Sequence, residues 1–239
     1  MDYDPSRTAS DEAKEKTREQ NTPLAERGQR LYDRWAENQL LYDLIARASA
    51  SPRKQACDQL DLSGGERVLE IGCGPGVNFE MLAEGISSNG AVVGIDYSTR
   101  MVQRAIARRR EHGWENIEVV RGDASRASFE PETFDAALAS LVLSVIPAAR
   151  EVIQAVHDAL SPGGRFVVFD ARARYREGSM RLLNPLRTRF VRRTFNHQEH
   201  GVVDELRAVF ERVAVVETFR AGSEYVAVAV KQPDSADNS

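Results

Sequence analysis

The 239-residue sequence predicts one α/β domain built on a doubly wound, mostly parallel seven-stranded sheet, with N-terminal capping helices and an antiparallel C-terminal strand. Short apolar runs rich in β-branched residues alternate with helical stretches between residues 65 and 170, which is typical of parallel strands covered on both faces. After residue 200, two strands lie so close in sequence that they are expected to pair antiparallel. The hydrophobic content of 42% suffices for one such domain.

The positions of these runs give the order of the elements. Strands are expected at 67–71, 92–95, 117–120, 134–139 and 165–169, and helices at 77–84, 99–112 and 150–160. Residues 172–200 are basic and follow neither period, so an irregular segment is expected there. The pattern then predicts a helix at 203–210 and strands at 213–218 and 224–230, joined by a turn at 220–223.

The two ends of the chain depart from this pattern. Residues 1–22 and 232–239 are charged or small and polar without apolar periodicity, which predicts disorder. Apolar residues recur at helical spacing between 24 and 48, and Ser51-Pro52 is a typical start for a second helix, which runs to Leu60. The domain, 23–231, is therefore divided into a helical cap (23–62), a core (65–170), a basic insert on the substrate side (171–200) and a C-terminal helix with a hairpin (201–231).

Charge and composition limit the classes of partner and the compartment. With 32 Lys+Arg against 36 Asp+Glu, the chain has a formal charge of -4 and no overall basic field, which argues against a nucleic-acid partner. Cys57 and Cys73 belong to no C-x-x-C pair or metal spacing, so reduced thiols are expected. No apolar run approaches roughly 20 residues and the start shows no signal-peptide pattern, so a cytoplasmic protein is expected, at most peripheral at a membrane.

A glycine-rich turn follows the first strand. In a doubly wound sheet this turn must let the backbone approach a ligand closely, and Gly72, Gly74 and Gly76 permit that because glycine has no side chain and accepts positive φ. Asp96 lies twenty positions after Gly76, at the end of the second strand. A carboxylate there is placed to accept hydrogen bonds from both hydroxyls of a ribose.

Two residues beside the turn discriminate between nucleotide-like ligands. The dinucleotide fingerprint G-x-G-x-x-G requires glycine at position 77, where this sequence has Val77. Glu70, just before the glycines, would repel a pyrophosphate but could receive the ammonium group of an amino-acid ligand. The turn therefore favours a zwitterionic ligand over a dinucleotide.

Five segments in order resemble the motifs of one enzyme family. Residues 68–76, Val-Leu-Glu-Ile-Gly-Cys-Gly-Pro-Gly, resemble motif I of the class I S-adenosylmethionine-dependent methyltransferases. Residues 93–101 resemble the second segment of that family, 122–124 its adenine-binding turn, 134–140 its fourth strand and 160–165 its last segment. The resemblance covers residues 65–170, is closest to the ubiquinone-menaquinone methyltransferase-like (type 11) members, and implies a Rossmann-like fold with 65–170 as the cofactor-binding core.

The resemblance implies S-adenosyl-L-methionine as the cofactor. Gly72 and Gly74 would pass near its methionine part, and Asp96 would hold its ribose. The other residues implied at this end of the cofactor are Glu70, Cys73, Gly76 and Ser140.

The adenine end is assigned in the same way. Tyr97 and Met101 would flank the ring, and Asp123 would accept from its amino group, with the Gly122 turn and the Ala124 amide beside it. Other roles stay open for three of them: Met101 as a core residue, Tyr97 as a surface aromatic and Asp123 as the cap of a turn.

The catalytic residue is left unassigned. Methyl transfer from a sulfonium is an in-line displacement in which alignment and desolvation suffice, so no dedicated group is required. If the acceptor must lose a proton, the candidate bases are His197, His200, Tyr32 and Tyr42. The His197/His200 pair lacks convincing companion ligands, so no metal is expected.

The acceptor is inferred from the insert. Residues 181–195 mix arginines with Leu, Phe and Val, as in a basic amphipathic helix that lies on an anionic membrane, although a solvated helix over the site is the alternative. The general pattern of the sequence, together with residues 31–36, is similar to that of methyltransferases of ubiquinone/menaquinone synthesis and of phospholipid head groups. The hypothesis is a small, lipophilic acceptor such as a quinone or membrane lipid; the alternatives are an RNA methyltransferase and a non-catalytic S-adenosylmethionine-binding protein.

Overall fold

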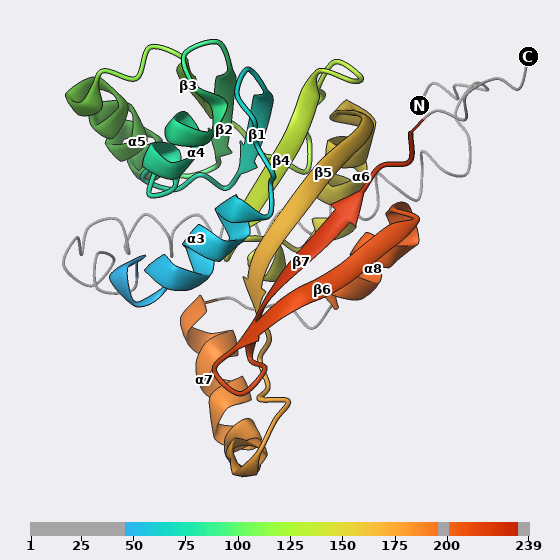
Figure 1. The fold of residues 1–239 in the computed structure, drawn as a ribbon. Coiled ribbons are helices and arrows are strands. Elements are labelled where there is room, and N and C mark those ends of the chain that lie inside the picture. The colour runs from blue at the N-terminus through green and yellow to red at the C-terminus, as the bar shows by residue number, and fades with distance from the viewer. Residues whose placement is uncertain (1–45, 196–200, 234–239) are drawn as a thin grey trace, which may run out of the picture.

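The computed structural model describes residues 46–195 and 201–233 (Figure 1). These residues form a seven-stranded sheet in the spatial order β3-β2-β1-β4-β5-β7-β6. The strands are β1 (Arg67–Ile71), β2 (Ala91–Asp96), β3 (Ile117–Arg121), β4 (Phe134–Ser140), β5 (Leu160–Ala171), β6 (Arg212–Phe219) and β7 (Glu224–Val230).

Strand direction agrees with the sequence prediction. β1 pairs in parallel with β2 and β4, β2 with β3, and β4 with β5. β7 lies between β5 and β6 and is antiparallel to both. The predicted mostly parallel sheet with an antiparallel last strand is therefore confirmed. The chain order reverses between β1 and β4, and in sheets of this type ligands bind at such a switch point, beyond the carboxyl ends of the strands.

Helices cover both faces of the sheet, because the strands bury side chains on both sides. One core cluster contains Leu69 and Ile71 of β1 and packs against α6 (Ala149–Ala159) and α8 (Val202–Val209), which lie behind the sheet in Figure 1. The other contains Val68 of β1 and packs against the opposite layer of helices. That layer consists of α3 (Ala50–Asp58), α4 (Phe79–Ile86) and α5 (Thr99–His112).

The starts of two elements differ by two or more residues from those expected. α4 begins at Phe79 rather than at residue 77, because the positive φ of Gly76 keeps the chain in the turn for two further residues. β5 begins at Leu160, five residues early. A Pro-Gly-Gly sequence reads as a turn, but here it forms an irregularity within the pairing, where the β4–β5 register jumps.

The insert was expected to be irregular overall, with residues 181–195 interpreted as a basic amphipathic helix. The structure has a 3₁₀ helix, η2 (Ser179–Leu183), and the helix α7 (Asn184–Phe195), which lies within that range. α7 is held by polar contacts to the backbone that leaves β5: the Asn184 amide bonds both the N–H and the C=O of Tyr175 (2.7 and 3.1 Å), and the Thr188 hydroxyl donates to the Ala173 carbonyl (3.3 Å). The insert is therefore less irregular than its overall pattern indicated.

The predicted helical cap is described only from residue 46. The predicted helix that begins at Ser51-Pro52 is α3, which packs against β4, β5 and β7. Residues 1–45, 196–200 and 234–239 lie outside the described part. The predicted disorder of residues 1–22 and of 234–239 therefore lies outside it too.

Candidate functional site

The glycine-rich turn lies at the carboxyl end of β1, at the switch point of the sheet. Gly72, Gly74 and Gly76 all have positive φ, of 63°, 54° and 73°. A Cβ at Gly72 would lie 2.3 Å from the side chain of Val142, and one at Gly76 would lie 2.5 Å from the ring of Phe79. Both the conformation and the space therefore require glycine at these two positions.

Asp96 ties this turn to the end of β2. One carboxylate oxygen accepts from the backbone N–H of Gly74 (2.9 Å) and the other from that of Ser98 (2.8 Å). The N–H of Gly122 in turn donates to the backbone carbonyl of Asp96 (3.0 Å). The three loops that follow β1, β2 and β3 therefore meet at Asp96, as the sequence motifs indicated.

Glu70 is buried beneath the turn, with 1% of its surface exposed. One carboxylate oxygen accepts from the Asn78 amide (2.6 Å), which also lies 3.3 Å from the Ser140 hydroxyl. The other oxygen is buried with no hydrogen-bond partner. Burial raises the pKa of Glu70 to about 7, against the lowering effects of the Asn78 hydrogen bond and the nearby Arg53. The site thus contains a buried carboxylate oxygen that accepts no hydrogen bond from the protein.

Sequence reasoning missed Arg53 and Asn78, which complete this network. Arg53, in the first turn of α3, is only 7% exposed; it donates from Nε to the Ser49 hydroxyl (3.0 Å) and from Nη1 to the Asn78 carbonyl oxygen (3.4 Å). No motif spacing marks Arg53, because its role depends on the packing of α3 against α4 and the sheet. Asn78 carried a weak signal, as a polar residue where the glycine turn enters a helix.

The residues expected at the adenine end differ in how far they are exposed. Met101 is 2% exposed and its N–H donates to the Ser98 hydroxyl (3.3 Å), whereas Tyr97 is half-buried. Asp123 accepts from both the N–H and the hydroxyl of Ser125 (3.0 and 2.7 Å). It therefore does cap a turn, and its expected bond to an adenine amino group stays a prediction.

Cys73 contributes to the site through its backbone. Its side chain is 2% exposed and points at β2, where a Cβ on Gly94 would lie 3.1 Å from its sulfur. Burial raises the pKa of Cys73 well above its ordinary value, and that of Cys57 to about 12. Both cysteines are free, neutral thiols with a packing role.

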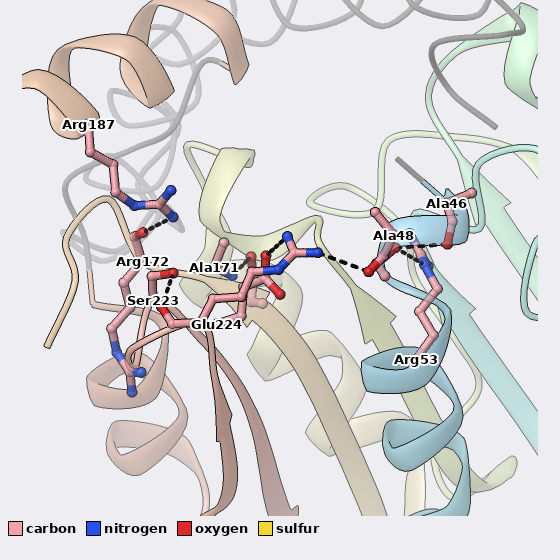
Figure 2. Close-up of polar contacts among 11 residues, drawn as sticks. Ala46, Ala48, Arg53, Ala171, Arg172, Arg187, Ser223 and Glu224 are labelled. Atoms are coloured by element: carbon pink, nitrogen blue, oxygen red, sulfur yellow. Dashed lines mark hydrogen bonds and ion pairs between the residues drawn. The ribbon is translucent and has the colours of Figure 1, made fainter. Parts of the chain in front are cut away.

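The carboxyl end of β5 and the start of β7 pair with each other at this edge of the sheet (Figure 2). Asp170 is fully buried and accepts from the N–H and hydroxyl of Ser144 (2.9 and 2.6 Å), which fixes the loop after β4. Arg220 bridges Glu224 (2.7 Å) and the Ala48 carbonyl before α3 (2.9 Å). The four candidate bases, Tyr32, Tyr42, His197 and His200, lie outside the described residues. Within residues 46–195 and 201–233, no three His, Cys, Asp or Glu side chains gather as metal ligands.

The residues present fit the cofactor that the motifs imply. The glycine turn has the positive-φ backbone that lets the chain approach a ligand closely, and Val142 and Phe79 leave no room for a side chain at Gly72 or Gly76. Glu70 offers a buried carboxylate oxygen to an ammonium group, and Asp96 lies where a ribose is expected.

Comparison with known proteins agrees with this geometry. The family described as "Methyltransferase domain" matches residues 62–211. A phosphatidylethanolamine N-methyltransferase of Cereibacter sphaeroides is 34% identical over 147 residues, which cover 61% of this chain and 68% of that protein. A demethylmenaquinone methyltransferase of Staphylococcus epidermidis is 28% identical over 118 residues, 49% of this chain and 48% of that protein. The chain thus spans about half the length of this second relative.

Solved structures of methyltransferases share the fold. One from Aquifex aeolicus has a TM-score of 0.58 at 17% identity, over 74% of this chain and 88% of that one. The geranyl diphosphate C-methyltransferase of Streptomyces coelicolor A3(2), in complex with S-adenosyl-L-homocysteine, has a TM-score of 0.62 at 17% identity, over 77% of each chain. The chain therefore belongs to the class I S-adenosylmethionine-dependent methyltransferases, with S-adenosyl-L-methionine as its cofactor.

Proposed function

We propose that this methyltransferase acts on a small lipophilic acceptor, a phospholipid head group or a quinone, at an anionic membrane surface. The observation that carries the proposal is the apolar face of α7, defined as the exposed apolar side chains of η2 and α7. They are Met180 (40% exposed), Leu182 (83%), Leu183 (49%), Leu186 (71%) and Phe190 (58%). An exposed apolar set of this size is typical of an interaction site.

Arginines accompany the apolar face of α7. Arg181, Arg189 and Arg192 are exposed on the same two helices, and residues 178–195 contain no acidic side chain. Each arginine near an anionic lipid surface contributes roughly 1 kcal/mol to binding. Apolar and basic side chains together favour a helix that lies in the membrane interface. No helix in the described part of the chain is long and apolar enough to cross a bilayer.

The position of α7 connects this surface to the chemistry. α7 follows β5 and is hydrogen-bonded to the segment that leaves it, so it extends from the same edge of the sheet as the glycine turn (Figure 1). A lipid held at α7 would present its head group toward that edge. The names of the two relatives, which act on phosphatidylethanolamine and demethylmenaquinone, support an acceptor with a polar head and an apolar tail.

The bound cofactor supplies a methyl group on a sulfonium, and the residues of this chain supply alignment. The glycine turn and Asp96 fix where the donor lies, because each is held by backbone contacts. The bond between Asp170 and Ser144 fixes the loop after β4, on the acceptor side. Alignment with exclusion of water can lower the barrier of such a displacement by up to about 7–11 kcal/mol, so this arrangement needs no further catalytic group.

The test measures both membrane binding and product. Wild-type protein is expected to co-sediment with vesicles containing an anionic phospholipid. The Leu186→Ser/Phe190→Ser variant is expected to bind these vesicles at least roughly tenfold more weakly, since two apolar side chains are lost. Val216→Ser, which changes an apolar side chain of β6 that is 39% exposed, is the matched control. With radiolabelled donor and a total lipid extract, the label is expected in an organic-phase product.

Two outcomes would remove the lipid proposal. One is the absence of vesicle binding by the wild type, together with labelled product in the aqueous phase alone. The other is labelling of RNA, with binding that weakens steeply with salt as phosphate contacts are lost. Donor binding without any labelled product, from lipid, small-molecule or RNA extracts, would indicate a non-catalytic protein.

A further inference from the structure

The burial of Arg53 needs an explanation. Arginine is almost never this buried unless it is paired with an anion, because its guanidinium stays charged. Yet within the described part of the chain its two side-chain hydrogen bonds go to neutral oxygens, those of Ser49 and Asn78. Glu70 is close enough for the Arg53 charge to lower the pKa of its carboxyl, but it accepts no hydrogen bond from Arg53. A buried cation whose hydrogen-bond partners are neutral is costly, so an anion bonded directly to Arg53 would lower that cost.

Asn78 separates Arg53 from Glu70. Its carbonyl oxygen accepts from Arg53 (3.4 Å), and its amide nitrogen donates to Glu70 (2.6 Å). Among the described residues, no salt bridge joins Arg53 to Glu70, and the second carboxylate oxygen of Glu70 has no partner. A buried cation and a buried carboxylate are thus held on the two sides of one amide.

The amino-acid end of the cofactor has matching charges, an ammonium and a carboxylate on one carbon. Glu70 suits the ammonium. The carboxylate would lie toward Arg53 and the first turn of α4, where Asn78 precedes the helix and backbone N–H groups favour an anion. The two charged ends would then each meet an opposite charge.

We propose that Arg53 binds the carboxylate of the methionine part of S-adenosyl-L-methionine, while Asn78 keeps it apart from the Glu70 that binds the ammonium. α3 is thereby part of the donor site and not only a cover for the sheet. The assignment rests on the cofactor and is independent of the acceptor.

The test compares three ligands by calorimetry on the full chain. S-adenosyl-L-methionine carries both charges, decarboxylated S-adenosylmethionine lacks only the carboxylate, and 5′-methylthioadenosine lacks the whole amino-acid end. Arg53→Gln is expected to weaken S-adenosyl-L-methionine by roughly ten- to a hundredfold, as for loss of a charge-assisted hydrogen bond, and to change the other two by less than about twofold. Arg53→Lys is expected to recover part of the loss, because it restores the charge without the planar fork.

The control is Lys54→Gln, the next residue on α3, whose ammonium lies on the surface beside Asp58 (2.8 Å) and should not affect any of the three ligands. Equal weakening of all three ligands by Arg53→Gln would show that Arg53 only supports the fold of the site and would overturn the proposal. If the variant does not fold, the wild type decides alone: decarboxylated S-adenosylmethionine must bind at least roughly tenfold more weakly than S-adenosyl-L-methionine. Equal affinity would refute a carboxylate contact. No acceptor enters these measurements, so their failure is distinct from failure of the lipid proposal.

Discussion

The buried carboxylate of Glu70 lowers the stability of the protein when no ligand is bound. Its carboxylate is buried, one oxygen lacks a hydrogen-bond partner, and burial raises its pKa to about 7. Proteins retain such unfavourable groups where function needs them, and binding of a cation would relieve the cost. A carboxylate held ready in this way can discriminate a zwitterionic donor from a fragment that lacks the ammonium.

The raised pKa of Glu70 predicts how stability varies with pH. The folded carboxyl titrates near 7 and the unfolded one near 4.5, so the folded state binds more protons between these values and loses stability as pH rises through them. The loss is on the order of 3 kcal/mol. Denaturant titrations from pH 5 to 8 should show the wild type losing stability relative to Glu70→Gln, which cannot ionise. Parallel curves for the two proteins would contradict the prediction, and saturating S-adenosyl-L-methionine should reduce the slope.

At the level of elements, the turn between β6 and β7 is joined to the start of α3. Arg220, Ala221 and Gly222 all have positive φ (49°, 56° and 72°), an unusual conformation for the first two. The Arg220 guanidinium lies between Glu224 and the Ala48 carbonyl and donates to both. One side chain thus connects the hairpin to the helix that carries Arg53.

Loss of the Arg220 side chain should therefore lower the stability of the whole domain, not only that of the hairpin. Arg220→Ala leaves the 9%-exposed Glu224 side chain without its cation, and about 2 kcal/mol of destabilisation is expected, less than for a fully buried pair because Arg220 is half exposed. Glu224→Ala in the same background should restore part of the stability, which a double-mutant cycle by denaturant unfolding would measure. Full additivity of the two losses would mean that the pair does not interact.

The elements also show what the sequence could predict. The strands and the glycine turn follow from local patterns, since periodicity and turn chemistry act within a few residues. The start of β5 was missed because Pro-Gly-Gly has the same local preferences in a turn and in a bulge. Arg53 was missed for a different reason: it is held by Asn78, 25 residues further along the chain. The motifs thus indicated the candidate residues that lie on the sheet, while the candidate on the covering helix required the structure.

On the scale of the whole molecule, charge is distributed unevenly. Residues 171–195 contain eight arginines and one acidic residue, in a chain whose formal net charge is -4. If α7 attaches to a membrane as proposed, this basic segment would orient the protein with α7 toward the anionic surface. Attachment through one surface helix would be weak enough to be reversible.

Salt should therefore weaken membrane attachment. Raising the ionic strength from about 0.1 M to about 1 M shortens the screening length from about 10 Å to about 3 Å, so the contribution of the arginines should be largely lost. Vesicle co-sedimentation should fall over this range, and Arg189→Gln/Arg192→Gln should flatten the salt dependence at low salt. Binding that does not vary with ionic strength would assign attachment to the apolar face of α7 alone.

The reversed direction of β7 has a practical consequence. Because β7 runs against its neighbours, it starts at the carboxyl edge with Glu224 and delivers Lys231 to the opposite edge, where its backbone pairs with Gly163 and Gly164 at the beginning of β5 (3.0 Å each). The chain beyond Val230 therefore leaves the domain on the side away from the glycine turn and α7. A surface tether attached there would immobilise the enzyme with its ligand-binding edge facing the solution. A fluorophore attached there would stay clear of that edge in single-particle binding measurements on supported bilayers.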